Sequence, residues 1–247
     1  MTRTVRLTIF AAAAAVLAGL LFWSVAGLPD FGHYHWPYGR VLNAVAVAER
    51  HTTNAVAATV FDFRGLDTMG EELILFGAVV GVAMLLRARE QDNREHVGDE
   101  VGSDAVRLVG LLLVGPALLL ALWLVSFGYV TPGGGFQGGV AIAGAIFLVY
   151  AASSFRSYSA LTPKPALDFL EGVGAGGYVV IGLAALISGL PFLHNLLGPG
   201  EKGTLLSGGS IPFLNWASAI EVAAANLLLF AEFLEEYIVP LARERAP

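Results

Sequence analysis

The sequence predicts an all-α integral membrane protein with about six transmembrane helices and one further interfacial or re-entrant helix. Two observations support this fold class. Hydrophobic residues make up 56% of the 247 residues and charged residues only 14%, whereas a soluble domain carries about 25% charged residues. The apolar residues also form runs of about 20 residues, which is the length that a helix needs to cross a bilayer.

Most of these runs have the full length of a membrane span, and one is shorter but uniformly apolar after Glu72. The segment 41–63 is helical in character but too polar for a lipid-facing span, because Glu49, Arg50 and Asp62 lie within it. We therefore expect spans at roughly 6–27, 69–86, 106–130, 137–155, 169–190 and 213–237, and an interfacial or re-entrant helix at 41–63.

The amino-terminal run has two interpretations. Arg3 and Arg6 precede an apolar stretch over 9–25, and Ser24-Val25-Ala26 resembles the small-residue site at which a signal peptide is cleaved. The run is long for the core of a signal peptide. We expect a retained first transmembrane helix, with a cleaved signal peptide as the alternative.

The distribution of basic residues predicts the orientation of the chain. If the amino terminus is cytoplasmic and 41–63 does not cross, ten Lys and Arg residues lie on the inner side and four on the outer side. The inner set is Arg3, Arg6, Arg87, Arg89, Arg94, Arg107, Arg156, Lys164, Arg243 and Arg245, and the outer set is Arg40, Arg50, Arg64 and Lys202. Cytoplasmic segments carry an excess of such residues. We therefore expect a multi-pass protein of the plasma (inner) membrane with both termini in the cytoplasm.

The hydrophilic stretch 88–104 divides the chain in two. We expect it to be a solvated cytoplasmic linker between a first membrane module, 1–87, and a four-span domain, 105–247.

Several classes of function are excluded by composition. The chain has no cysteine, which excludes disulfides, thiolate metal sites, cysteine-ligated iron–sulfur clusters and cysteine nucleophiles. No basic patch is present that would bind nucleic acid. His33 and His35, with Asp30 nearby, make a weak case for a metal, and an aromatic interfacial loop is the alternative. We expect no cofactor, no metal and no catalytic centre.

Ionisable residues within membrane spans are candidate functional residues because charge in hydrocarbon is costly. A first group follows segment 41–63. Asp67 and Glu71 are four residues apart and would share one face of a helix, and Arg64 is close enough to neutralise Asp62 or Asp67. The alternative is helix capping by Asp67 or Thr68, with Glu71 and Glu72 favoured by the helix dipole.

A second group lies in the last span. Glu221 sits eight residues into it, or about 12 Å from its start, and shares a stripe of the helix with Glu232 and Glu235. Since this span has no Lys or Arg, the charge of Glu221 has to be met by another helix, water, a cation or a proton. The alternative is a protonated or intermolecularly bonded Glu221 that serves assembly. We interpret Glu232, Glu235 and Glu236 as interfacial.

Residues 131–139 read Thr-Pro-Gly-Gly-Gly-Phe-Gln-Gly-Gly. Glycine and proline oppose a helix by about 1 and about 3 kcal/mol relative to alanine, so the segment predicts a break between two spans. A tight turn with close helix packing at Gly138 and Gly139 is one interpretation. A phosphate cradle is not, because the lysine of such loops is absent.

Two stretches resemble two parts of one family. Residues 54–71, which include Asp-Phe-Arg-Gly-Leu-Asp-Thr-Met-Gly-Glu, resemble the carboxy-terminal region of the large A-type component of Mrp-type multisubunit Na⁺/H⁺ antiporters. Residues 105–237 resemble the MnhB-type domain of the same antiporters, with its signature at Pro132, Gly133, Gly134, Gly135, Phe136, Gly138 and Gly139. The chain looks like a fusion of the two modules. Membrane-bound hydrogenases carry similar modules as small subunits.

This resemblance implies a membrane subunit of a monovalent cation/proton antiporter, with other membrane subunits, Na⁺, H⁺ and the lipid bilayer as partners. Its candidate ion-path residues are Glu71, Asp67 and Asp62, to which the apolar setting adds Glu221. Two alternatives stay open at this point. The chain is the equivalent module of a redox-driven complex, or it only holds larger subunits together.

Overall fold

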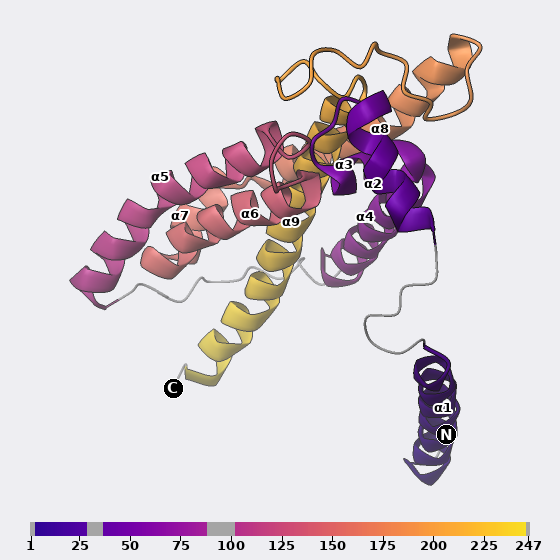
Figure 1. The fold of residues 1–247 in the computed structure, drawn as a ribbon. Helices are drawn as coiled ribbons and strands as arrows, with labels where there is room; N and C mark the ends of the chain where they lie inside the picture. Colours follow the sequence, from indigo (N-terminus) through magenta and orange to yellow (C-terminus); the bar gives the residue numbers. More distant parts are fainter. Residues whose placement is uncertain (1–2, 29–36, 88–101, 246–247) are drawn as a thin grey trace. The chain divides into compact units, whose positions relative to one another are not determined.

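The structure is a computed structural model that describes residues 3–28, 37–87 and 102–245, and in these residues every regular element is a helix, with no strand (Figure 1). Six of its helices are long and apolar enough to cross a membrane, which confirms the predicted fold class. The elements in chain order are α1 (Arg3–Ala26), α2 (Tyr38–Glu49), α3 (Ala55–Ala58), the π-helix η1 (Thr59–Phe63), α4 (Gly65–Arg87), α5 (Asp104–Ser126), α6 (Gly135–Ala152), α7 (Phe155–Leu161), α8 (Lys164–Ile187) and α9 (Ile211–Arg245).

Segment 41–63 is not one helix. It is divided into α2, α3 and η1, none of which has the length of a membrane span. The division comes from local chemistry, because His51 has a positive φ of 53° and the Asn54 side chain accepts hydrogen bonds from the amides of Val56 and Ala57, so that it caps a new helix. Residues 88–101 of the expected linker, and Asp30, His33 and His35, lie outside the described residues.

The chain divides into two compact units, Met1–Val41 and Leu42–Pro247, which we describe separately. The first contains α1, whose apolar side chains are exposed along the whole span. In the second, α9 is the central helix. Its span is 67% buried, against 11% for α5, because α4, α5, α6 and α8 all pack against it.

One end of the second unit holds its long connections, namely residues 50–64, 127–134 and 188–210, and we call this the loop end. Asn54 links the first connection to the second, since its amide group donates to the carbonyls of Gly128 (2.6 Å) and Thr131 (3.2 Å). Thr53 donates to the carbonyl of Val130. The broken backbone between α5 and α6 thus finds its partners in the segment before α4.

The third connection is tied to the other two by single side chains. The Tyr129 hydroxyl donates to the carbonyl of Leu205 (2.7 Å), and burial raises the pKa of that hydroxyl, which keeps it a donor. Asn195 accepts from the amide of Ser210 (2.7 Å) and donates to Asp62 (3.3 Å). The loop end is therefore one hydrogen-bonded layer.

Helices α8 and α9 are antiparallel and touch closely at Gly174. A Cβ atom at Gly174 would lie 2.5 Å from the amide nitrogen of Glu221 and 2.6 Å from its Cβ atom. Only glycine permits this approach, because any side chain would push the two helices apart.

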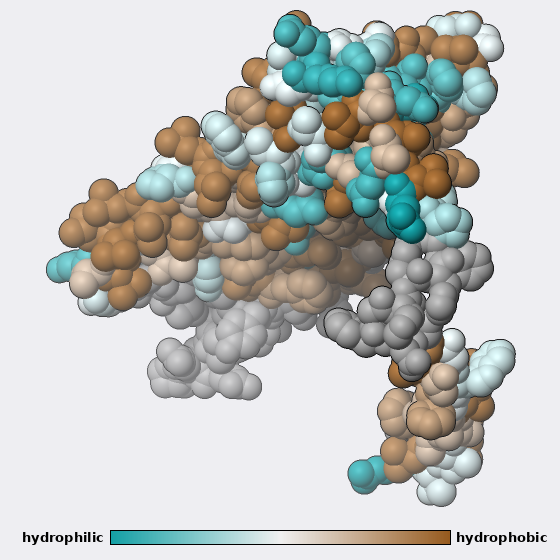
Figure 2. Space-filling view, viewed as in Figure 1, coloured by the Kyte–Doolittle hydropathy of each residue, from teal (hydrophilic) through white to brown (hydrophobic). Residues whose placement is uncertain are grey.

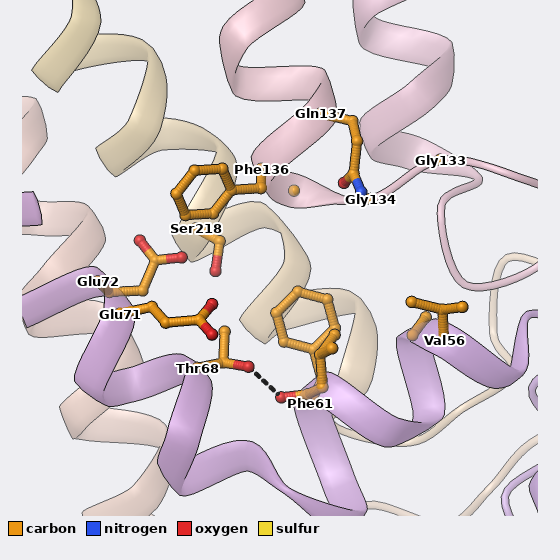
Figure 3. Close-up of a pocket in the computed structure, with 13 residues that line it drawn as sticks. Val56, Phe61, Thr68, Glu71, Glu72, Gly133, Gly134, Phe136, Gln137 and Ser218 are labelled. Carbon is orange, nitrogen blue, oxygen red and sulfur yellow. Dashed lines mark hydrogen bonds between the residues drawn. The ribbon is translucent and has the colours of Figure 1, made fainter. Parts of the chain in front are cut away.

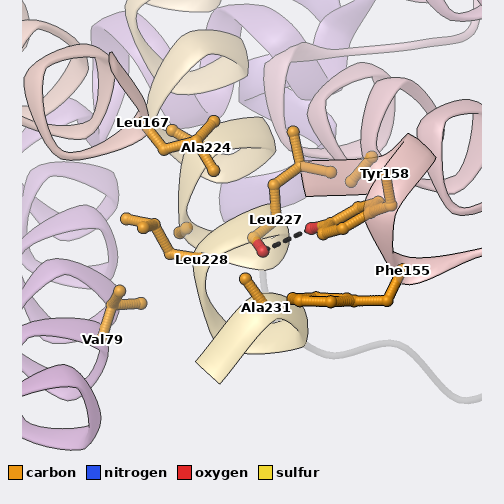
Figure 4. Close-up of a cluster of buried hydrophobic side chains, with 10 residues drawn as sticks. Val79, Phe155, Tyr158, Leu167, Ala224, Leu227, Leu228 and Ala231 are labelled. Atoms are coloured by element: carbon orange, nitrogen blue, oxygen red, sulfur yellow. Dashed lines mark hydrogen bonds between the residues drawn. The ribbon is translucent and has the colours of Figure 1, made fainter. Parts of the chain in front are cut away.

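The end opposite the loops contains an aromatic and aliphatic cluster in which α7 packs against α9 (Figure 4). Its polar anchor is the Tyr158 hydroxyl, which donates to the carbonyl of Leu227 (2.6 Å). Burial raises the pKa of Tyr158, so the hydroxyl stays neutral and keeps donating. Tyr158 thus fixes the short helix α7 to the central helix.

The outer surface of the second unit is apolar along its helices and hydrophilic at the loop end. Along α5, leucine side chains such as Leu108, Leu112 and Leu119 are exposed. Figure 2 shows this apolar surface over α5, with hydrophilic residues gathered toward the loop end. A surface of this kind suits lipid or partner helices.

The contact at Gly174 generates a stability prediction. Gly174→Ala should lower the stability of the chain in its detergent-solubilised assembly by about 1–3 kcal/mol, because the added methyl group overpacks the helix crossing. Gly176→Ala is the matched control, since no atom lies within 4 Å of a Cβ there, and it should be neutral or slightly stabilising. Thermal unfolding of both variants measures the difference, and equal midpoints would contradict the close crossing.

The bridge at Asn54 generates a second prediction. Asn54→Ala should lose the helix cap, worth about 1 kcal/mol, together with the two bonds to the 127–134 connection, each worth about 1 kcal/mol. Asn54→Ser keeps a capping side chain and loses only the bridge. Limited proteolysis and thermal unfolding should rank Ala below Ser and Ser below wild type. Wild-type stability of the Ser variant would show that the bridge contributes nothing.

Candidate functional site

Two glutamates from distant parts of the chain meet inside the second unit. Glu72 lies in the third turn of α4 and is 1% exposed, and Glu221 lies in the third turn of α9 and is 0% exposed. Their carboxyl groups are neighbours that interact directly. Both helices are candidate membrane spans, so the pair is set in the apolar part of the protein.

No described residue neutralises the pair. None of its four carboxyl oxygens has a hydrogen-bond partner in regular geometry among the described residues. Two adjacent carboxylates that are cut off from water repel each other strongly. A buried carboxyl pair therefore has to hold a proton or a cation.

The start of α4 is fixed so that Glu72 faces α9. The Thr68 hydroxyl donates to the carbonyl of Val60 (2.6 Å) in η1, and the carbonyl of Gly65 accepts from the Tyr178 hydroxyl on α8 (3.0 Å). These two bonds hold the first turn of α4 from two sides. Glu72 follows one turn after Thr68 and is turned toward the same packed face.

The glycine segment positions the other half of the pair. The break between α5 and α6 comprises residues 127–134, so it begins four residues earlier than the expected 131–139, and Gly135, Gly138 and Gly139 belong to α6. A Cβ at Gly135 would lie 2.8 Å from the Cβ of Ser218, and one at Gly139 would lie 2.8 Å from the Cβ of Val222. The glycines therefore bring α6 against the stretch of α9 that carries Glu221.

A cavity of about 270 Å³ lies beside the pair, between the start of α4, the glycine segment and α9. Figure 3 shows Glu71 and Glu72 side by side on α4 at this cavity, with the carboxyl group of Glu72 directed toward Ser218. The lining also includes Thr68 and Gln137. The remaining lining is Val56, Ala57, Val60, Phe61, Gly133, Gly134, Gly135 and Phe136.

Ser218 adds a buried hydroxyl group at the cavity. It is 1% exposed, and its hydroxyl oxygen has no hydrogen-bond partner among the described residues. Its neighbour one turn earlier, Asn215, is used differently, because its amide group donates to the carbonyl of Val125 (2.5 Å) and ties α9 to α5. The cavity is thus lined by oxygens of Glu72 and Ser218 for which the described residues offer no partner.

Of the first group of candidate residues, Asp62 and Asp67 lie apart from the carboxyl pair and have other partners. Asp62 is paired with Arg50 (2.5 Å) and with Asn195 (3.3 Å), and Asp67 is paired with Arg64 on an exposed turn. Contrary to the capping interpretation, Asp67 does not cap α4, because the helix begins at Gly65 and Asp67 lies within its first turn, where the helix dipole favours it. Both aspartates therefore have structural partners at the loop end.

The sequence indicates Glu71 as the ion-path candidate and Glu72 as a residue at the helix start, but the structure buries Glu72 and not Glu71. Glu71 is exposed and lines the cavity, whereas Glu72 is buried against Glu221. The capping interpretation of Glu72 does not apply, because α4 begins at Gly65 and Glu72 lies beyond its first turn. The available signal was the spacing of Glu72 from Val79, a full two turns later on the buried face.

Glu232 and Glu235, in the part of α9 remote from the loop end, form ion pairs with a lysine side chain. Lys164, at the first position of α8, donates to Glu232 (3.0 Å) and Glu235 (2.8 Å). The helix α8 starts earlier than the expected span 169–190, which brings this lysine into the bundle. In the described part of the chain no group of three His, Asp or Glu side chains is arranged to hold a metal ion.

Comparisons with known proteins identify the chain at the level of its family. Residues 105–228 match the model of a domain related to the MnhB component of Na⁺/H⁺ antiporters. The chain is similar to an uncharacterised protein of Methanocaldococcus jannaschii, with 32% identity over 74% of this chain and 78% of that one. It is also similar to the B-type component of the Na⁺/H⁺ antiporter of Bacillus subtilis, with 29% identity over 43% of this chain and 71% of that one.

Two solved structures share the fold. A chain of the membrane-bound sulfane sulfur reductase, an archaeal respiratory membrane complex, matches with a TM-score of 0.73 and 30% identity, over 93% of this chain and 98% of that one. A chain of the Mrp complex from Dietzia matches with a TM-score of 0.70 and 22% identity, over 94% of this chain and 26% of that one.

The match at residues 105–228 covers the glycine segment and reaches past Glu221, whereas Glu72 lies before the matched domain. The chain belongs to the family whose members carry a domain related to the MnhB component of Na⁺/H⁺ antiporters, and it is a membrane subunit of this antiporter family or of a related membrane-bound respiratory complex.

Proposed function

We propose that this chain lines the ion path of a multisubunit monovalent cation/proton antiporter of the plasma membrane and that its Glu72–Glu221 pair holds the transported proton or cation. One observation supports this most directly. Two adjacent carboxyl groups are fully buried in a membrane bundle, and the described residues leave their oxygens without partners.

The chemistry of such a pair suits reversible occupancy. A single proton, or a Na⁺ ion held between the oxygens, relieves the repulsion of two adjacent carboxylates, and its departure restores that repulsion. A site of this kind binds its ion without holding it permanently. A salt bridge to Lys or Arg would have removed this property by neutralising the pair for good.

The cavity supplies a route to the pair from the loop end. Glu71 is exposed and lines it together with Glu72, so its charge would concentrate cations at the entrance. Ser218 offers a further oxygen ligand next to Glu72. Oxygen atoms are the ligands that hard cations prefer. The cavity therefore serves as the vestibule of the pair in this proposal.

The chain acts with partners. Similar proteins are subunits of multisubunit membrane complexes, and the exposed apolar surface of α5 offers room for neighbouring membrane helices. We propose that other subunits supply the remainder of the transmembrane path and that this chain has no catalytic centre of its own.

A second candidate is the same role in a redox-driven complex. The chain of the sulfane sulfur reductase complex is matched over 98% of its length, whereas the chain of the Mrp complex is matched over 26%. The one-to-one correspondence in length favours a respiratory complex as the host. Purification of the assembly under mild detergent distinguishes the hosts, because a redox complex would bring an iron–sulfur protein with it.

A purely structural role is the third candidate. The carboxyl oxygens of Glu72 and Glu221, which lack partners among the described residues, argue against it. Buried carboxyl groups that stabilise a fold are normally satisfied by hydrogen bonds or ion pairs. Asp62 in the same chain shows that pattern with Arg50 and Asn195. The carboxyl pair of α4 and α9 does not.

Neutral variants of the pair test the proposed function. Glu72→Gln and Glu221→Gln each keep the shape of the side chain and remove its exchangeable charge, so each should reduce cation/proton exchange in everted vesicles to the level of vesicles that lack the chain. Asp67→Asn is the matched control, because Asp67 is an exposed partner of Arg64, and it should transport as wild type. Co-purification of partner subunits checks assembly, and normal transport by both Gln variants would refute the ion-path role.

Chemical modification gives an independent prediction. Hydrophobic carbodiimides attack protonated carboxyl groups in apolar surroundings, so peptide mapping of the treated complex should find modified Glu72 or Glu221 and unmodified Asp67. If Na⁺ competes for the pair, added Na⁺ should reduce this modification. Modification that spares both glutamates would argue that neither holds a proton.

A further inference from the structure

A third buried glutamate lies close to the pair and is not used in the function proposed above. Glu171 is on α8 and is 3% exposed. It belongs to the buried face of that helix, which also carries Leu167, Gly174 and Tyr178. The same face packs against α9, so Glu171 is directed into the bundle at a level between Leu167 and Gly174.

The register of the two antiparallel helices places Glu171 next to Glu221. Gly174 lies against the backbone of Glu221, and Lys164 reaches Glu232 at the far end. Glu171 is three residues from Gly174 and therefore about 4.5 Å further along the axis. Its carboxyl group is near enough to that of Glu221 for the two to repel when both are charged.

Glu171 also lines a second cavity. This cavity has a volume of about 290 Å³, lies between α4 and α8, and is lined by Val79, Val80, Ala83, Met84, Asp168 and Glu171. None of these residues lines the first cavity. Asp168 is exposed and lies one turn from Glu171 toward the end opposite the loops. Glu171 is thus the group that the second cavity and the pair have in common.

Helices α4, α8 and α9 contribute charged side chains to the part of the bundle that holds Glu171. Helix α9 presents Glu221 and α4 presents Glu72, while α6 has no Asp, Glu, Lys, Arg or His in its sequence. Lys164 is seven residues away, or about 10 Å along α8, and is held by Glu232 and Glu235. Among the described side chains of α8, Glu171 is the carboxyl group that interacts with Glu221.

We propose that Glu171 is a proton-transfer residue that connects the Glu72–Glu221 pair with the cavity lined by Asp168, so that the pair is reached from both ends of the bundle. This inference rests on the proposed function. In the transfer, an O–H bond breaks at Glu221 and one forms at Glu171, which leaves Glu221 as the carboxylate and Glu171 as the acid. No other group changes charge, and Asp168 or water in the cavity accepts the proton next.

A proton suits this second route better than a hydrated cation. The cavity is lined by four apolar side chains and two carboxyl groups, which is too few oxygens to replace the hydration shell of Na⁺. A proton needs only a chain of titratable groups and water at hydrogen-bond distances. The two cavities would then differ in what they pass, with cations or protons on the loop side and protons on the other.

The absence of cysteine from the sequence allows water access to be measured directly. In the intact complex, Ala83→Cys should react with a charged, membrane-impermeant methanethiosulfonate, because Ala83 lines the second cavity. Ala78→Cys is the matched control on the same helix, since Ala78 is exposed and lines neither of the two cavities, and in lipid it should not react. Peptide mapping of this chain identifies the modified residue. An unreactive Ala83→Cys would overturn the second opening.

Transport measurements test the residue itself. Glu171→Gln should reduce proton-coupled exchange severalfold, and Glu171→Asp should restore much of it because the acid group is kept. Carbodiimide modification of the pair should persist in Glu171→Gln, since that variant leaves Glu72 and Glu221 in place and shows that the bundle is folded. Wild-type exchange by Glu171→Gln, or equal loss in Glu171→Asp, would overturn the role of Glu171.

The outcome for Glu171 separates from the outcome for the pair. If Glu221→Gln abolishes exchange and Glu171→Gln does not, the proposed function stands and the second route falls. If Glu221→Gln transports normally, the proposed function itself falls, whatever the result at position 171.

Discussion

The close approach of two helices to α9 is the constraint on which the rest of the structure depends. Helix α6 reaches it through Gly135 and Gly139, and α8 reaches it through Gly174, all at the stretch that carries Ser218 and Glu221. A side chain at any of these glycines would separate the helices and let lipid or water into the centre of the bundle. The glycines thus produce the dry, tightly packed surroundings in which a carboxyl group becomes sensitive to one proton.

Much of the fold was predictable from the sequence, because span length and apolar content are local properties. The six spans and the all-α class follow from them. Glu221 was also identifiable, since an acidic residue deep in an apolar run is conspicuous. Glu72 and Glu171 were not, because both lie near the start of a span, where a carboxylate reads equally well as interfacial. Only the packing of α4 and α8 on α9 shows that they face inward.

In the sequence, the glycine segment and the carboxylates are separate features, the first a family signature and the second the candidate ion-path residues. The structure makes them parts of one arrangement, because Gly133, Gly134 and Gly135 line the cavity that Glu71 and Glu72 also line. Along α9 the carboxylates lie at two levels, with Glu221 near the loop end and Glu232 and Glu235 toward the opposite end. Glu171 and Lys164 fill part of that interval, and both come from α8, whose beginning lies earlier than its apolar run suggests.

The origin of Glu72 and Glu221 in a single polypeptide has a consequence for how the site is inherited and maintained. Two carboxyl groups on separate subunits would depend on matched expression and on an association equilibrium, and the pair would be lost whenever one of the two chains dissociated. A shared chain sets their ratio at one to one and turns their encounter into an intramolecular event with a high effective concentration. Dilution, partial assembly or exchange of subunits therefore leaves the pair complete, and a substitution on one side meets the same partner in every copy.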